Sequence, residues 1–236
     1  MRITDTSDLW WKTAVIYCLD VETFLDWNDD GLGDFPGLAQ RLDYLESLGI
    51  TCLWLMPFYP TPDRDDGYDI VDFYGVDPRL GTLGDLVEVI RTARDRGMRV
   101  IADLVVNHTS DRHPWFKSAR ASRTSKFRDF YVWADSPPAN AKAEPTFPDQ
   151  ETSVWTFDEQ AGQYYLHRFY KYQPDLNVAN PLVPTRSLRS WGTGSSSGSP
   201  DSGSMPCRSS WRPWACPMPN PRCLTRTSTS GTYALS

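Results

Sequence analysis

The residues with the clearest potential for chemistry follow a short apolar run. Asn107 and His108 come directly after Val100–Val106, and both side chains can hydrogen-bond or bind ions. The run is too short for a globular helix and is β-branched and apolar on both faces except at Asp103, which predicts a buried parallel strand. Polar residues at the C-terminal end of such a strand lie where α/β proteins bind ligands. A plain strand followed by a polar turn is the alternative interpretation.

A second polar cluster, Asp65–Asp69, follows another apolar run at Cys52–Met56. Because the ends of parallel strands meet at one edge of a sheet, we expect this loop to lie beside the first cluster. Asp69 can accept hydrogen bonds from hydroxyl groups, and Tyr68 offers a flat face to a sugar ring. Such a polar cluster beside aromatic side chains suits a carbohydrate ligand.

A third loop, residues 26–34, alternates oxygen-bearing side chains with other residues, including two glycines. Hard cations such as Ca²⁺ take several oxygen ligands at once, which alternating carboxylates in a tight loop can provide. The loop is similar to the first half of an EF-hand loop, but the closing Glu is absent and a predicted strand precedes it. Both a cation loop and an acidic surface turn remain open. The oxygen-bearing residues of this alternating pattern are Asp26, Asn28, Asp30 and Asp34.

Strand and helix patterns alternate ahead of these loops. Ala14–Leu19 and Cys52–Met56 read as strands, like Val100–Val106. The order strand, helix, strand, helix, strand predicts right-handed βαβ units and a parallel sheet. Apolar residues at helical spacing are Leu38, Leu42, Leu45 and Leu48 in the first helix, and Leu83, Leu86, Val87, Ile90 and Ala93 in the second.

The second half of the chain breaks this rhythm. Residues 109–180 are rich in aromatic and turn residues, which predicts an inserted, irregular β-rich subdomain. Residues 184–236 are dominated by Ser, Pro, Gly, Thr and Arg with no hydrophobic period, a composition typical of a disordered tail.

Composition narrows the classes of partner. The net charge of −6 argues against a nucleic-acid partner. The first residues carry no apolar signal segment and no run reaches transmembrane length, so we expect a soluble, cytoplasmic protein without a membrane partner. Cys18 and Cys52 lie in apolar segments and are predicted to be reduced core residues.

Several of these motifs resemble those of the α-amylase family of glycoside hydrolases. Asp103–His108 is similar to the family's strand-three motif, Asp66–Asp69 to its strand-two loop, and Gln173–Asn177 to a short motif near the end of its inserted B domain. The loop 26–34 is similar to the cation loop of the oligosaccharide-acting branch. The longer phrases that most resemble the branch interconverting maltose and trehalose include Arg64–Ile70, Asn107–Phe116 and His167–Phe169.

The resemblance covers about residues 9–183 and implies a (β/α)₈ barrel. Residues 9–108 would form its first three βα units, and residues 109–180 the B domain inserted after strand three. The family's reaction is retaining and uses two carboxylates, one as nucleophile and one as general acid/base. The implied ligand is a small α-glucoside such as maltose or trehalose.

The resemblance also implies roles for single residues. Tyr68 would stack on the sugar ring, and Asp69 and His108 would bind it where the bond breaks, with His108 stabilising the transition state. Asp103 and Asn107 would be structural residues at the strand end. The implied Ca²⁺ ligands are Asp26, Asn28, Asp30, Leu32 and Asp34.

The sequence departs from the family's pattern after Asn180. No residue matches the nucleophile, the acid/base or the third carboxylate, and we infer a reading-frame shift near Val183–Thr185, because a neighbouring frame can encode the strand-four motif. As written, the chain is expected to fold poorly and to be a truncated, inactive enzyme, since an open barrel leaves strand edges unpaired. An α-glucosidase that hydrolyses maltose or short α-glucans is the first alternative, and a non-catalytic carbohydrate-binding fragment is the second.

Overall fold

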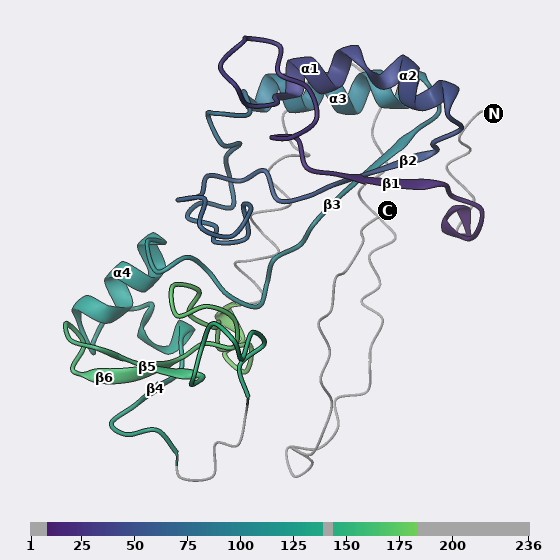
Figure 1. Cartoon of the computed structure of the whole chain (residues 1–236). Helices are drawn as coiled ribbons and strands as arrows, with labels where there is room; N and C mark the ends of the chain where they lie inside the picture. The colour runs from purple at the N-terminus through teal and green to yellow at the C-terminus, as the bar shows by residue number, and fades with distance from the viewer. Residues whose placement is uncertain (1–8, 139–143, 184–236) are drawn as a thin grey trace.

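A computed structural model describes residues 9–138 and 144–183 (Figure 1). The predicted tail at 184–236 and the inferred frame shift lie outside these residues. No helix in the described ranges is long and apolar enough to cross a membrane. In chain order the elements are η1 (Trp10–Lys12), β1 (Ile16–Leu19), α1 (Phe35–Gln40), α2 (Leu42–Ser47), β2 (Cys52–Leu55), α3 (Leu83–Asp95), β3 (Arg99–Ala102), α4 (Pro114–Ala121), η2 (Arg128–Phe130), β4 (Trp133–Ala134), β5 (Trp155–Asp158) and β6 (Gln163–Leu166).

The first half of the chain builds a parallel sheet in the order β1-β2-β3, which confirms the predicted βαβ units. Leu19 pairs with Leu55 and Leu55 with Ala102, so the C-terminal ends of the three strands lie level. Helices α1, α2 and α3 lie together over the sheet (Figure 1). Leu38 of α1 and Val89 of α3 are fully buried, so these helices enclose the core.

The first helical segment is interrupted at Arg41. Apolar spacing predicts one helix through Leu48, but the structure has α1 and α2 with Arg41 between them at φ −100° and ψ 4°. Its N–H donates to the Leu38 carbonyl, three residues back, so the chain tightens at this point. Leu42 and Leu45 are buried as predicted, whereas Leu48 is 55% exposed.

Helix α3 buries a narrower stripe than the sequence predicts. Leu86 and Ala93 are buried, but Leu83 and Val87 are each 52% exposed. Val89, absent from the predicted face, is fully buried. The buried residues follow one another at steps of three and four, which is a single helical stripe. Leu83 continues this spacing but is the first residue of the helix, and Val87 lies beside the stripe.

Strand β3 ends at Ala102, four residues before the predicted end at Val106. The Asp103 N–H still donates to the Leu55 carbonyl at 3.2 Å. Among the described strands β3 pairs only with β2, so no second neighbour extends its ladder. The residues after Ala102 therefore run as a loop toward the second half of the chain.

Residues 109–138 and 144–183 form a second lobe, with an antiparallel sheet in the order β4-β6-β5 and helix α4 beside it (Figure 1). The prediction of an irregular β-rich segment missed α4. The N-cap of α4 is His113, and the buried stripe of α4 is Trp115, Phe116 and Ala119. Phe116 stacks on Trp133 of β4 with ring centroids 5.6 Å apart, so the helix packs on the sheet through aromatic rings.

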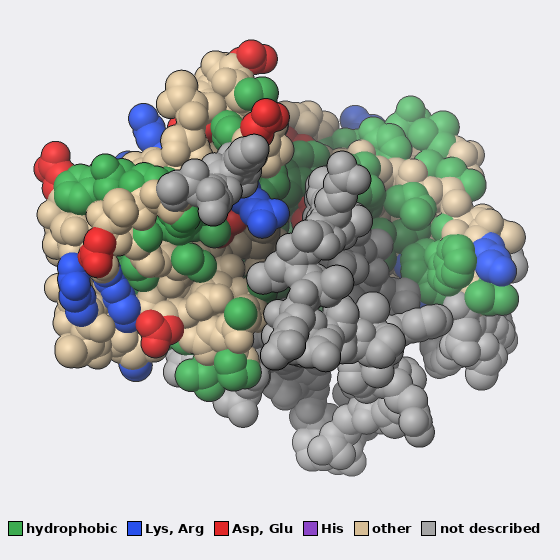
Figure 2. Space-filling model, turned by 90° about the horizontal axis from the view of Figure 1, so that it is seen from below, with side chains coloured by type: hydrophobic (Ala, Val, Ile, Leu, Met, Phe, Trp, Pro, Cys, Tyr) green, Lys and Arg blue, Asp and Glu red, His purple; other side chains and the backbone are tan. Residues whose placement is uncertain are grey.

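Part of the surface of residues 9–108, which form the first lobe, is apolar. Val15, Ile16 and Tyr17 are 50, 45 and 37% exposed, and Figure 2 shows hydrophobic side chains at the surface on that side of the molecule. Cys18 is also exposed, so its prediction as a core residue is wrong, whereas Cys52 is buried as predicted. Within the described strands β1 is an edge strand, and less of its surface is covered.

Candidate functional site

The carboxylate that follows β3 organises two aromatic side chains. The Trp54 indole donates to Asp103 Oδ1 at 2.9 Å, and the Tyr68 hydroxyl donates to Asp103 Oδ2 at 2.7 Å. Asp103 is 4% exposed, so these two bonds offset the cost of burying its charge. Burial and the contact with Asp103 raise the pKa of Tyr68, which keeps the hydroxyl protonated as a donor.

Asp69 lies on the loop after β2 and is fully buried. Its Oδ1 accepts hydrogen bonds from the Thr61 hydroxyl at 2.7 Å and the Arg64 N–H at 3.2 Å. Its Oδ2 accepts from Arg64 Nε at 2.9 Å. A carboxylate has about four acceptor positions, so these protein donors leave about one, on Oδ2, for a ligand.

His108 lies against the same loop and is 3% exposed. Its Nε2 is 3.2 Å from the Tyr68 carbonyl, and its Nδ1 is 3.2 Å from the Asn107 amide nitrogen. Both contacts are satisfied when Nε2 carries the proton and Nδ1 accepts. Burial lowers the pKa of His108 to about 4, so the ring is neutral near pH 7.

The second lobe meets this strand end through Asp175. Its Oδ1 accepts a hydrogen bond from the Asn107 side chain at 3.1 Å, and the Leu176 N–H donates to the Asn107 carbonyl at 2.7 Å. Burial raises the pKa of Asp175 to about 7, opposed by the Arg168 N–H and its charge. Asn107 therefore joins the loop after β3 to the short motif at Gln173–Asn177.

In the loop 26–34, Asn28 and Asp30 are exposed and Asp26 is half-buried. Asp26 accepts from the Gly31 N–H at 2.8 Å, and Asn28 from the Asp30 N–H at 2.9 Å. Asp30 accepts from the Leu32 N–H at 2.9 Å. These bonds shape the loop while leaving further lone pairs on each side chain, a set of oxygen donors that suits Ca²⁺.

Asp34 differs from the rest of the loop because it is 3% exposed and caps α1. Its Oδ1 accepts from the Gly37 N–H at 2.7 Å, and its Oδ2 from the Trp27 N–H at 3.3 Å. Within the described ranges, no group of three or more acidic, His or Cys side chains converges as a metal site. The predicted Ca²⁺ site, including Leu32, stays a prediction.

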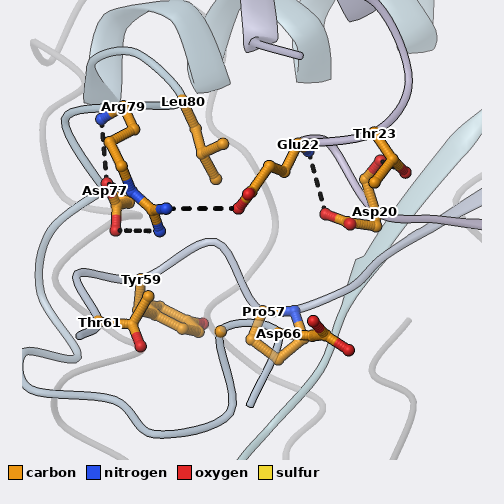
Figure 3. A pocket seen from close by; sticks show the side chains of 11 residues that line it. Asp20, Glu22, Thr23, Pro57, Tyr59, Thr61, Asp66, Asp77, Arg79 and Leu80 are labelled. Atoms are coloured by element: carbon orange, nitrogen blue, oxygen red, sulfur yellow. Dashed lines mark hydrogen bonds and ion pairs between the residues drawn. The ribbon is translucent and has the colours of Figure 1, made fainter. Parts of the chain in front are cut away.

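A small polar pocket lies beside the ends of β1 and β2 (Figure 3). Its volume is about 80 Å³, below the ~300 Å³ at which ligand pockets usually begin, so it is too small for a disaccharide. The Arg79 guanidinium lies 3.1 Å from Asp77 and 3.6 Å from Glu22. The residues predicted to bind sugar are absent from its lining, which is Asp20, Glu22, Thr23, Pro57, Tyr59, Thr61, Asp66, Gly67, Asp77, Arg79 and Leu80.

Sequence reasoning missed two arginines that organise these loops. Arg64 pairs with Asp69, and Arg79 bridges Asp63 at 2.7 Å as well as Asp77. Each arginine stands near several acidic residues in the sequence, which was a usable signal for an ion pair. The partners 47 residues away, such as Asp111 for Arg64, could not be read from that pattern.

An α/β sheet with buried polar side chains at its carboxyl edge has the architecture with which α/β domains bind their ligands, and comparison with known families identifies the family. Residues 19–192 match the family model "Alpha amylase, catalytic domain", so the chain belongs to the α-amylase family. Trehalose synthase of Thermus thermophilus is 54% identical over 175 residues, covering 74% of this chain and 18% of that protein.

Other relatives give a consistent picture. A trehalose synthase/amylase of Mycolicibacterium smegmatis is 51% identical over 180 residues, covering 76% of this chain and 30% of that protein. An oligo-1,6-glucosidase of Halalkalibacterium halodurans is 45% identical over 179 residues, covering 75% and 31%. The chain thus spans less than a third of the length of these relatives.

Solved structures agree on the fold. A variant of trehalose-6-phosphate hydrolase of Bacillus licheniformis superposes with a TM-score of 0.73 at 40% identity, over 78% of this chain and 34% of that one. A variant of a trehalulose synthase in complex with glucose gives a TM-score of 0.72 at 43% identity, with the same coverage. The described residues therefore have the α/β fold of an α-amylase-type domain.

Proposed function

We propose that this chain forms part of the catalytic domain of an enzyme that interconverts maltose and trehalose. The observation that carries the proposal is the junction at the sheet edge, where the His108 ring contacts the Tyr68 carbonyl and Asp69 lies next in sequence. Identities of 49 to 54% with trehalose synthases, against 45% with an oligo-1,6-glucosidase, favour this branch of the family.

The proposed roles follow from the chemistry of the side chains. Tyr68 stacks on the glucose ring, and Asp69 accepts a hydrogen bond from a sugar hydroxyl at its remaining lone pair. His108 is neutral, and its one N–H, which the Tyr68 carbonyl accepts here, would be shared with a sugar oxygen, so that His108 stabilises the transition state without adding a positive charge. Asp103 and Asn107 are structural residues that orient Tyr68 and His108.

The reaction would proceed with retention at the anomeric carbon. A carboxylate nucleophile attacks C1 of one glucose unit while a protonated carboxyl group gives its proton to the departing glucose. The released glucose then attacks through a different hydroxyl, and exclusion of water decides between isomerisation and hydrolysis. Neither carboxylate is assigned within the described residues, so we propose that the chain as written has no turnover.

The domain boundaries belong to the same proposal. Residues 9–108 would be the first three βα units of a (β/α)₈ barrel, residues 109–180 its inserted B domain, and residues 184–236 an unrelated tail. The level strand ends of β1, β2 and β3 and the antiparallel sheet of the second lobe support the first two assignments. We also propose a cytoplasmic location.

We further propose that Asp26, Asn28 and Asp30, with Leu32 and Asp34, hold Ca²⁺. Calcium should raise the thermal unfolding midpoint of the chain, because an ion that binds the folded state stabilises it. Asp26→Asn should abolish that rise. Asp29→Asn is the matched control, since Asp29 lies in the same loop at φ 60°, a backbone conformation that Asn tolerates. An equal rise of the unfolding midpoint with calcium in both variants would refute the proposed calcium site.

A hydrolase is the second candidate, favoured by the 47% identity to an α-glucosidase of Pediococcus pentosaceus. The test joins residues 9–183 of this chain to the remaining part of the Thermus thermophilus enzyme. The chimera should convert maltose mainly to trehalose. If it makes only glucose, the hydrolase is favoured. If neither sugar forms in the folded chimera but maltose binds, the alternative of a non-catalytic carbohydrate-binding fragment is favoured.

A further inference from the structure

One arginine touches both the proposed sugar-binding carboxylate and the second lobe. Arg64 Nε donates to Asp69 Oδ2 at 2.9 Å, while its Nη2 donates to Asp111 Oδ1 at 2.5 Å. The same Nη2 donates to Ser110 Oγ at 3.0 Å. The guanidinium plane therefore spans two carboxylates that are 42 positions apart in the sequence, one in the loop after β2 and one after β3.

Tyr172 holds the same arginine from the second lobe. The Arg64 guanidinium lies over the Tyr172 ring, 4.3 Å from its centroid, and the Tyr172 hydroxyl donates to the Arg64 carbonyl at 2.8 Å. Only a planar guanidinium can stack on a ring and bridge two carboxylates at once, whereas a lysine ammonium is a point charge. Both the main chain and the side chain of Arg64 are thus fixed by residue 172.

Neighbouring bonds make this contact a continuous junction. The Ser110 N–H donates to the Ile70 carbonyl at 2.9 Å, and the Asp111 N–H to the Tyr172 carbonyl at 2.8 Å. The Gln173 side chain donates to Asp65 at 2.6 Å. We define the junction as residues 64–70, 110–111 and 172–173; within it, Arg64 joins Asp69 to Asp111 and Tyr172.

We propose that Arg64 is a positioning residue that couples Asp69 to the second lobe. Binding of an α-glucoside at Asp69 would then make the backbone of residues 110–111 and 172–173 more rigid. Asp69 is fully buried and the Arg64 side chain is 28% exposed. A sugar hydroxyl that hydrogen-bonds to Asp69 must therefore do so beside the guanidinium of Arg64. Any shift of the guanidinium changes its contacts with Asp111 and Tyr172. This coupling rests on the proposed function only in assigning the sugar to Asp69.

The test is amide hydrogen exchange of the full 236-residue chain, comparing wild type with Arg64→Lys and Tyr172→Phe. Arg64→Lys keeps the charge but loses the bridge, so amides in 64–70, 110–113 and 172–173 should exchange at least 10-fold faster, with β2 unchanged. Tyr172→Phe removes the hydrogen bond to the Arg64 carbonyl, so this change in the second lobe should also speed amide exchange in 64–70. Arg91→Lys is the control, since Arg91 is 62% exposed and pairs with Glu88 on α3.

Two results would overturn the proposal: faster exchange confined to 64–70, or faster exchange throughout the chain including β2. Adding maltose separates this proposal from the function. In wild type, maltose should slow exchange in both 64–70 and 110–113, and in Arg64→Lys only in 64–70. If maltose has no effect on wild type but Arg64→Lys still loosens 110–113, sugar binding is refuted and the positioning role stands. If maltose slows both segments equally in wild type and Arg64→Lys, the positioning role is refuted and sugar binding stands.

Discussion

Replacing Asp103 with Asn should destabilise the chain markedly, because this buried carboxylate accepts from both Trp54 and Tyr68. A hydrogen bond to a charged group contributes about 1.5–3 kcal/mol, and a buried donor left without a partner costs about 1–3 kcal/mol. The Asn oxygen can accept one of the two donors, but its amide group faces the other. We therefore expect Asp103→Asn to lower the free energy of unfolding by about 3 kcal/mol.

Urea unfolding followed by far-UV circular dichroism measures this loss. Asp129→Asn is the control, because Asp129 is exposed. Trp54→Phe removes one donor, so the double variant with Asp103→Asn should show a coupling energy of about 1 kcal/mol. A loss below about 0.5 kcal/mol for Asp103→Asn would refute Asp103 as the shared acceptor of Trp54 and Tyr68, and strictly additive variants would refute its bond to Trp54.

Three further outcomes are expected. Burial lowers the pKa of His113 to about 3. The unfolded chain therefore binds a proton on His113 near pH 6.5, whereas the folded chain does not. As a result, the free energy of unfolding falls by up to about 1.4 kcal/mol per pH unit as pH drops from 6.5 toward 3. His113→Asn keeps an acceptor for the Trp115 N–H and should flatten that fall; equal slopes in urea titrations would contradict it. Ile16→Lys should reduce light scattering of the concentrated chain, because Ile16 is 45% exposed on an edge strand, and unchanged scattering would argue against that edge as the cause. The 236-residue chain alone should leave maltose unconverted in an NMR time course, and trehalose or glucose formation would disprove this.

The sequence allowed prediction of those features that depend on local pattern. Short apolar runs gave the three parallel strands, and the polar residues after them were correctly expected at one edge of the sheet. The contact between His108 and Tyr68 follows from the level strand ends. In these cases the periodicity and the connection rules of α/β proteins were sufficient.

Features that depend on tertiary contacts were not predictable. The break at Arg41 and the exposure of Leu48 could not be read from the leucines, whose helical spacing continues through both positions. Helix α4 was missed because its aromatic residues resemble those of the surrounding strands. The role of Arg64 depends on Asp111 and Tyr172, which lie far away in the sequence.

The central claim is that Tyr68, Asp69 and His108 bind the glucose ring of an α-glucoside. Saturation-transfer NMR titration of the chain with maltose measures this directly, with Asp69→Asn and Asp66→Asn compared at equal circular dichroism. Asp66 is the matched control, because it lies on the same loop and lines the small pocket instead. We predict that Asp69→Asn weakens maltose binding at least 10-fold and Asp66→Asn leaves it unchanged. Equal binding by wild type and Asp69→Asn, or no binding by wild type, would contradict the claim.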